Sequence, residues 1–424
     1  MRKTQLLLAL AAIGFASSAF ATNGYFAHGF GIKSKGMGGV GIAYSQDTLA
    51  AATNPAGMVL VGDRVDLGAE IFNPNREATI SGTVNRLPGT LSPFDPGEIA
   101  SNGTFESGKE YFLIPEFGYN RMIKPDMSIG VSVFGNGGMN TEYSPISAFN
   151  IAGNKTGVDL MQLFISPTVA MKVNADHAVG ASLNLAYQRF KAYGISNFRA
   201  VSGSPTNLSD NGYDDSFGLG VRVGWTGRLS PTVTMGATYQ SKTKMSKLDK
   251  YSGLFAEQGD FDTPANYGLG IAIKATPQTT VAVDVVRIEY GDIKSISNNI
   301  STLGVNLLGA PSAPGFGWKD QSVIKLGVSY DVSDKLTVRA GYNHGSSVIP
   351  NTEVAFNILA PATVEDHITL GGTWKLQNGA ELSGYFMHAF KESITGATPQ
   401  LGVAATSTIK MDQNAIGIAY GWKL

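Results

Sequence analysis

Apolar and polar residues alternate with a period of two along most of the chain, from residue 64 to residue 424. The stretch FGLGVRVGW at 217–225 has large apolar side chains at every second position, with glycine or arginine between them. The stretch NAIGIAYGWKL at 414–424 has the same pattern. A period of two indicates β-strands with unlike faces, because successive side chains of a strand point to opposite sides. The chain is therefore predicted to be all-β.

Fourteen segments of this kind are predicted. Their spans are 64–80, 110–123, 128–141, 157–173, 178–191, 215–229, 232–243, 264–276, 279–292, 321–331, 335–345, 365–376, 379–391 and 409–424. The connections after even-numbered segments are short, as at Lys124-Pro-Asp and Ser230-Pro, whereas most of those after odd-numbered segments are long, as at 192–214 and 293–320. Outer-membrane barrels have an even strand number, short periplasmic turns and long outer loops. The regular alternation of short and long connections predicts a 14-stranded antiparallel transmembrane β-barrel.

The composition of the two strand faces indicates which one meets lipid. The polar face is rich in Gly, Ser, Thr and Asn, and the apolar face often ends in Tyr or Trp. In a soluble sandwich two apolar faces would pack on each other. Aromatic residues at segment ends instead favour a barrel with its apolar face toward lipid and its polar face toward the lumen. The segment 409–424 is expected to close the barrel by pairing with the first, because lipid does not tolerate an open strand edge.

Composition narrows the class of protein further. The 424 residues include 32 Lys+Arg and 33 Asp+Glu, so no strong field favours a nucleic acid partner. The absence of cysteine excludes thiol catalysis and fits an exported protein. Residues 1–21 are predicted to be a cleaved signal peptide, since Arg2 and Lys3 precede a short apolar run and Ala19-Phe-Ala fits the cleavage site. The expected location is the bacterial outer membrane.

Catalytic and cofactor motifs are weak in this chain. The five histidines form no spacing typical of a metal site, and no nucleophile motif accompanies them, so neither an enzyme nor a cofactor is predicted. The stretch GMGGVG at 36–41 fits G-x-G-x-x-G, but a dinucleotide site needs a preceding buried strand. Close backbone packing inside a barrel is the better explanation of these glycines.

Residues 22–62 do not alternate, and they are rich in Gly and Ala. They are predicted to form an N-terminal plug that fills the lumen, ahead of a barrel at 63–424. Within the plug, residues 47–53 are predicted to make two helical turns with Ser45 or Asp47 as N-cap, and Pro55 is predicted to end them.

The same segment resembles a known family. The glycine-rich run to Tyr44, followed by Asp47 and by Asn54-Pro55-Ala56 ahead of a first strand, resembles the hatch of the FadL/TodX (OmpP1) outer-membrane transporters. The stretch GVSVFGNGGMN at 130–140 is similar to that family's interrupted third strand. The resemblance implies a monomer that passes hydrophobic molecules inward without ATP. Outer loops would capture the ligand, a pocket beside the hatch would hold it, and a kink in the third strand would release it sideways into the outer-membrane lipid.

Long-chain fatty acids are the substrate favoured by the resemblance, with aromatic hydrocarbons as the alternative. A general porin is less favoured, because the predicted lumen is apolar in places and has a plug. The predicted ligand-binding residues are Phe26, Phe30, Phe112, Ile114, Phe134, Phe164, Val286 and Ile288. Packing against the plug is the alternative role for these side chains.

Two further groups of residues complete the predicted site. The hatch motif is Asn54, Pro55 and Ala56, and the predicted gate in the third strand is Gly135, Asn136, Gly137 and Gly138. Three glycines in four positions disfavour a regular strand and predict a bulge or bend. Arg222, Lys325 and Arg339 could meet a fatty-acid carboxylate, but pairing with the hatch or with lumen carboxylates is favoured. Those carboxylates are Asp66, Glu70, Glu116 and Asp284.

Overall fold

The computed structural model describes residues 22–82, 102–150, 152–401 and 404–424. The predicted signal peptide at 1–21 lies outside the described residues. Among the helices that the structure describes, none has both the length and the apolar character needed to cross a bilayer.

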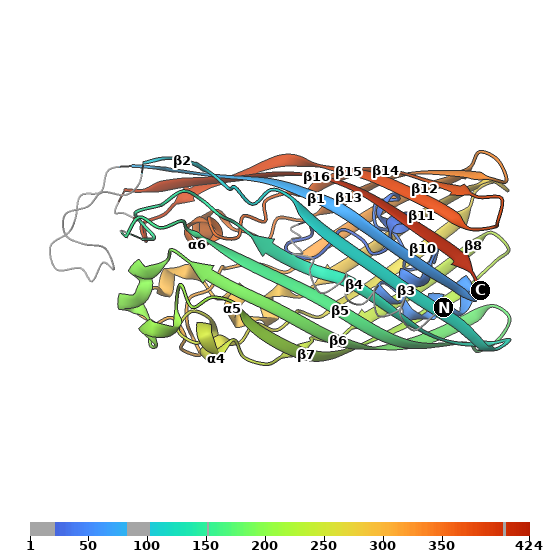
Figure 1. The fold of residues 1–424 in the computed structure, drawn as a ribbon, viewed down its shortest axis with the longest axis horizontal. Helices are drawn as coiled ribbons and strands as arrows, with labels where there is room; N and C mark the ends of the chain where they lie inside the picture. The colour runs from blue at the N-terminus through green and yellow to red at the C-terminus, as the bar shows by residue number, and fades with distance from the viewer. Residues whose placement is uncertain (1–21, 83–101, 151, 402–403) are drawn as a thin grey trace.

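The described strands form one closed antiparallel barrel (Figure 1). Of the sixteen strands in its sheet, β2 (Gly103–Glu106) and β9 (Lys244–Met245) are short additions that pair with β1 and β7. The other fourteen form the wall. They are β1 (Arg64–Ser81), β3 (Phe112–Lys124), β4 (Met127–Asn140), β5 (Gly157–Lys172), β6 (His177–Tyr193), β7 (Asp214–Arg228), β8 (Val233–Gln240), β10 (Asn266–Lys274), β11 (Thr279–Ile288), β12 (Gln321–Asp331), β13 (Leu336–Gly345), β14 (Asp366–Lys375), β15 (Glu381–Ala397) and β16 (Thr406–Lys423).

Closure of the barrel is made by the last strand, as predicted. β16 pairs with β1 along the full length of both strands, from Arg64–Lys423 to Ser81–Thr406. The wall strands correspond one to one with the fourteen predicted segments. Four of them differ from the predicted length by four residues, because β8, β10 and β11 are shorter and β15 is longer. β15 continues to Ala397, where its outward side chains are polar and the apolar alternation is lost. β11 ends at Ile288, because the chain turns there to place Tyr290 in the interior.

The apolar face of the strands points outward, which confirms the predicted orientation. Leu269, Leu370 and Ile416 on three different strands are each more than 60% exposed, whereas the inward Thr369 and Gln413 are buried. Tight turns gather at one end of the barrel together with the C-terminus. The helices α4 (Ala256–Gly259), α5 (Lys294–Ser297) and α6 (Val354–Asn357) lie among the long loops at the other end (Figure 1). These are called the turn end and the loop end below.

The helices that the structure describes are all short. The α-helices are α2 (Ile32–Lys35), α3 (Met58–Val61), α4 (Ala256–Gly259), α5 (Lys294–Ser297) and α6 (Val354–Asn357). The 3₁₀ helices are η1 (Thr48–Ala52), η2 (Pro55–Gly57), η3 (Ser196–Val201), η4 (Pro205–Asn207), η5 (Asp249–Tyr251), η6 (Tyr290–Asp292), η7 (Ile300–Thr302) and η8 (Asn351–Glu353). In the plug, Asp47 is the N-cap of η1 and accepts a hydrogen bond from the backbone N–H of Leu49. Pro55 begins a second 3₁₀ turn, where the sequence had predicted only the end of a helix.

Charged side chains of the wall hold the plug inside the barrel. Asp284 accepts hydrogen bonds from the backbone N–H groups of Gly41 and Ile42, at 2.7 and 3.0 Å. Glu70 forms a buried ion pair with Lys35 of α2, with 2.7 Å between Oε2 and Nζ. Each carboxylate therefore exchanges its hydration for donors of the plug, as a buried charge requires.

The three wall cations singled out from the sequence also bind the plug, which was one of the two favoured pairings. Arg222 donates to the Thr53 carbonyl at 2.9 Å. Lys325 donates to the His28 carbonyl at 2.8 Å. Arg339 donates to Oε1 of Gln46 at 2.7 Å.

Glycines of the wall make room for the plug backbone. Asn54 of the hatch motif caps η2 and donates from Nδ2 to the carbonyls of Ile42 and Trp225, at 2.7 and 2.9 Å. A Cβ on Gly224 would lie only 1.9 Å from Oδ1 of Asn54. Likewise, a Cβ on Gly341 of β13 would lie 2.0 Å from the backbone nitrogen of Gly38. The glycine run that fits G-x-G-x-x-G therefore serves close packing against the wall, as predicted.

Candidate ligand pocket and wall gap

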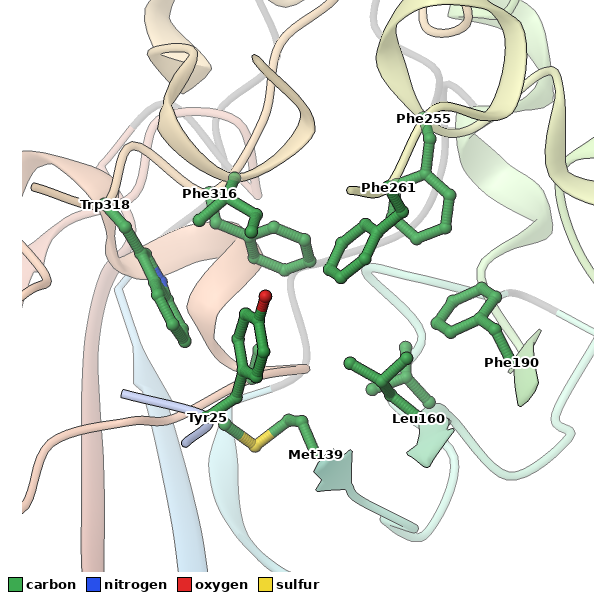
Figure 2. A pocket seen from close by; sticks show the side chains of 11 residues that line it. Tyr25, Met139, Leu160, Phe190, Phe255, Phe261, Phe316 and Trp318 are labelled. Atoms are coloured by element: carbon green, nitrogen blue, oxygen red, sulfur yellow. The ribbon is translucent and has the colours of Figure 1, made fainter. Parts of the chain in front are cut away.

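An apolar pocket lies at the loop end of the barrel, above the first described residues of the plug (Figure 2). We call it the aromatic pocket, and the space between its lining side chains, counted out to its open side, is about 390 Å³. Its lining residues are Tyr25, Met139, Val158, Leu160, Phe190, Phe255, Phe261, Ile296, Phe316, Trp318 and Ala360. None of these residues is charged, so the pocket offers a ligand little besides apolar and aromatic surface.

Separate parts of the chain converge on this pocket. The loop ends of β4, β5 and β6 supply side chains on one side. The others come from α5, from both flanks of α4, from the segment between η7 and β12, and from the residues after α6. The plug contributes Tyr25 from below (Figure 2). The pocket therefore depends on loop, wall and plug together.

Contacts between aromatic rings give the lining of the aromatic pocket a defined shape. The ring centroids of Phe190 and Phe255 lie 4.8 Å apart, and those of Phe255 and Phe261 lie at the same distance. Tyr25 lies 6.2 Å from Phe261 and 6.1 Å from Trp318. Tilted and edge-on rings at such distances attract one another through their quadrupoles, and a planar aromatic guest can join the same arrangement.

A second cavity adjoins the first. It has an empty volume of about 470 Å³, and it shares Val158, Phe190, Phe255 and Phe316 with the aromatic pocket. Its other lining residues are Ile195, Phe198, Leu254, Ser295, Leu308, Pro314, Gly315, Phe356 and Leu359. The two spaces are divided by the four shared side chains, so rotation of an aromatic ring could join them.

The base of the aromatic pocket is a strand-like pairing between plug and wall. The N–H of Gly138 donates to the Tyr25 carbonyl at 3.0 Å, and the N–H of Ala27 donates to the Asn136 carbonyl at 3.2 Å. Phe26 forms a β-bridge with Gly137. The predicted bulge in this stretch is confirmed, because the β4–β5 register shifts between Gly135 and Gly137 and leaves Asn136 unpaired.

At its bulged end, β4 no longer pairs with β3. Pairing between β3 and β4 stops at Phe117–Val133, although β3 begins at Phe112 and β4 runs on to Asn140. Over residues 112–116 the described strand β3 is paired with β1 alone. We call this unpaired interval the wall gap. The inward side chains of Phe112 and Ile114 border it and belong to the same buried apolar cluster as Phe26.

None of the eight predicted ligand-binding residues lines either cavity. Phe26, Phe112 and Ile114 cluster beside the wall gap, and Ile288 and Val286 belong to the same cluster or pack against it. Phe30, Phe134 and Phe164 form a separate group with plug residues, with 4.8 Å between the rings of Phe30 and Phe134. The contacts of these eight residues therefore fit the alternative role, which was packing against the plug. Their direct contact with a ligand stays a prediction.

The pocket residues escaped prediction because most of them lie in loops or at strand ends. Phe255, Phe261 and Phe316 lie in aperiodic segments, where alternation gives no signal. A concentration of aromatic residues in the long loops was the available clue. Large apolar residues in loops that a soluble surface would keep polar indicate an interior or a binding surface.

Comparisons with known proteins agree with this architecture. The family model described as "Outer membrane protein transport protein (OMPP1/FadL/TodX)" matches residues 18–423. A 47 kDa outer membrane protein of Pasteurella multocida (strain Pm70) is 24% identical over 429 residues, covering 91% of each chain. The P. putida toluene transporter TodX has a TM-score of 0.70 at 18% identity, covering 94% of this chain and 99% of that one. A Pseudomonas aeruginosa FadL homologue has a TM-score of 0.70 at 14% identity, with the same coverage. At these identities the solved structures show the shared fold.

Proposed function

The chain belongs to the OMPP1/FadL/TodX family of outer membrane transport proteins, which are channels for hydrophobic compounds, and from this premise we propose that it takes up small uncharged aromatic molecules. The observation that supports this choice is the aromatic pocket, where six aromatic side chains and no charged one surround the space. Burial of apolar ligand surface stabilises a complex by about 25 cal/mol per Å², and planar rings add the contacts described above.

Fatty acids, the substrate favoured from sequence, fit this pocket less well. A fatty-acid carboxylate would lose its hydration there, at a cost of several kcal/mol unless a cation replaced the water. The lining residues include no cation, and the inward Arg222, Lys325 and Arg339 are all bonded to the plug. An uncharged aromatic molecule carries no such cost. TodX, which shares the fold, is a toluene transporter, in agreement with the proposal.

The proposed route runs from the loop end to the side of the barrel. A ligand would pass from the second cavity into the aromatic pocket by displacing the shared rings. It would next displace the pairing of residues 25–27 with β4, which holds the base of the pocket. The wall gap between β3 and β4 would then lead into the membrane. The first step opens apolar contacts and the second breaks a short run of backbone hydrogen bonds, so each step is a local opening and the proposed transport is passive.

Binding of toluene and oleate to the purified protein tests the substrate class. We expect toluene to bind with a Kd at least about tenfold lower than that of monomeric oleate, because only oleate brings an uncompensated carboxylate into the aromatic pocket. Isothermal titration calorimetry in detergent, with the protein-free micelle titration subtracted, gives both constants. Oleate binding without toluene binding would overturn the aromatic proposal and restore the fatty-acid one.

Removal of the bulge residue tests the wall gap. Deletion of Asn136 should straighten β4 and let it pair with β3, which closes the gap. We expect toluene uptake by cells to fall at least about tenfold, while toluene still binds the purified variant. The matched control is Asn136→Ala, which loses the 3.0 Å hydrogen bond to Gln162 but retains the extra residue. Normal uptake by the deletion variant at matched surface expression would exclude the gap as the exit.

A further inference from the structure

One polar group faces the aromatic pocket without a suitable partner. The hydroxyl of Tyr25 is buried and lacks a hydrogen bond of normal geometry among the described residues, although the side chain is only 2% exposed. Figure 2 shows this hydroxyl directed between Phe316 and Phe261, into the space that the lining residues surround. A buried hydroxyl left without a partner costs about 1–3 kcal/mol, so its presence calls for an explanation.

Neighbouring polar groups do not use the proton of this hydroxyl. The Gln162 amide faces the hydroxyl oxygen as a donor and acts to lower the pKa of Tyr25, against the larger effect of burial, so it leaves the hydroxyl proton unused. Its Nε2 donates to Gln188 and Thr263, at 2.7 and 3.3 Å, and its Oε1 accepts from Asn136. The other polar side-chain group of the lining, the indole N–H of Trp318, donates to Asn357 at 2.6 Å. Tyr25 therefore retains a hydrogen-bond donor that points into apolar space.

The hydroxyl is present as a neutral donor and is held in place. Burial raises the pKa of Tyr25 well above its usual value near 10, so the proton stays on the oxygen at physiological pH. The backbone N–H of Tyr25 donates to the Tyr290 hydroxyl at 3.2 Å, and its carbonyl accepts from Gly138. The ring contacts Phe26, with 5.2 Å between centroids. These contacts fix the direction of the hydroxyl before a ligand arrives.

Water would serve this donor poorly. A buried water usually needs two to four polar partners, and the lining side chains offer it the Tyr25 hydroxyl alone. A ligand with an apolar ring and a single acceptor atom meets both needs, because the ring fills the apolar space and the acceptor takes the proton. A carboxylate would accept the proton too, but one neutral donor does not compensate a buried negative charge.

We propose that the aromatic pocket selects uncharged aromatic molecules that bear one hydrogen-bond acceptor, such as an aryl ketone, and that the Tyr25 hydroxyl is the group that recognises the acceptor. This specificity rests on the proposed function, since it requires that the pocket binds aromatic molecules at all. It adds a polar criterion to a site whose other lining groups recognise shape and apolar area.

A pair of ligands of equal shape tests this specificity. Acetophenone and α-methylstyrene differ only in C=O against C=CH₂, so a Tyr25→Phe change should affect them unequally. We expect Y25F to weaken acetophenone binding about fivefold, the size typical of one neutral hydrogen bond, and to leave α-methylstyrene binding unchanged or slightly tighter. Calorimetry in detergent gives both constants, and the ratio between variants cancels the difference in water solubility.

The matched control is Tyr143→Phe. Tyr143 is also a buried tyrosine whose hydroxyl has no partner among the described residues, but it is absent from the lining of the pocket. We expect Y143F to leave the ratio of the two dissociation constants unchanged. Equal changes for both ligands in Y25F would overturn the inference while leaving the proposed function intact. Failure of both ligands to bind the native protein would overturn the proposed function itself.

Discussion

Replacement of Ala360 by tryptophan is expected to lower toluene uptake at least about tenfold without loss of the barrel. Ala360 lines the aromatic pocket and is buried, so an indole at this position would occupy the space intended for a ligand. A loss of about 1.4 kcal/mol of binding free energy corresponds to tenfold, and overpacking of a filled site costs about 1–3 kcal/mol. Uptake of radiolabelled toluene by cells, together with calorimetric binding to the purified variant, measures the effect.

The control for this substitution is Ala200→Trp, which adds the same side chain to an exposed alanine of η3 outside both cavities. We expect its uptake and binding to match the native protein. Retention of β-structure and of heat-modifiable migration in A360W would show that the barrel has formed. Native toluene binding by a folded A360W would mean that the ligand site lies elsewhere.

The sequence predicted the wall of this protein far better than the pocket. Strand existence follows from a period of two, which depends on the environment of each face and not on distant contacts. For this reason Leu269 and Ile416 were placed toward lipid correctly. The same logic failed at the outer part of β15, whose outward residues are polar, so the strand continues where the apolar alternation stops.

The plug was predicted in part, and by different reasoning. The inward position of Lys325 and Arg339, combined with the cost of burying a charge, favoured pairing with lumen carboxylates or with the plug, and the structure shows contacts with the plug. In contrast, Phe255, Phe316 and Trp318 approach one another only through loop conformations that no local pattern encodes. The pairing of residues 25–27 with β4 is likewise a long-range contact and could not be read from either segment alone.

The buried ion pair between α2 and β1 leads to the prediction with the largest structural effect. Lys35 lies 2.7 Å from Glu70 and 4.0 Å from Glu116, and all three side chains are almost fully buried. The hydroxyl of Tyr385 also donates to Glu70. A Lys35→Met change would leave two wall carboxylates without this cation, and loss of one partner of a buried pair costs about 3–5 kcal/mol. The plug is then expected to release from this part of the wall.

Loosening of the plug should appear as leakage of polar solutes. We expect K35M to raise small-sugar permeation into proteoliposomes several-fold, because the lumen that the plug fills would become open to water. The double variant K35M/E70Q is the matched control, since it removes the cation together with its nearest carboxylate and leaves Glu116 with its 2.9 Å hydrogen bond from the backbone N–H of Ile32. It should leak less than K35M, because replacement of both buried partners avoids the unpaired charge that makes single removal costly. Equal permeation by the native protein and K35M would show that this ion pair does not hold the plug, and the anchoring role would then fall to Asp284, Arg222 and Lys325.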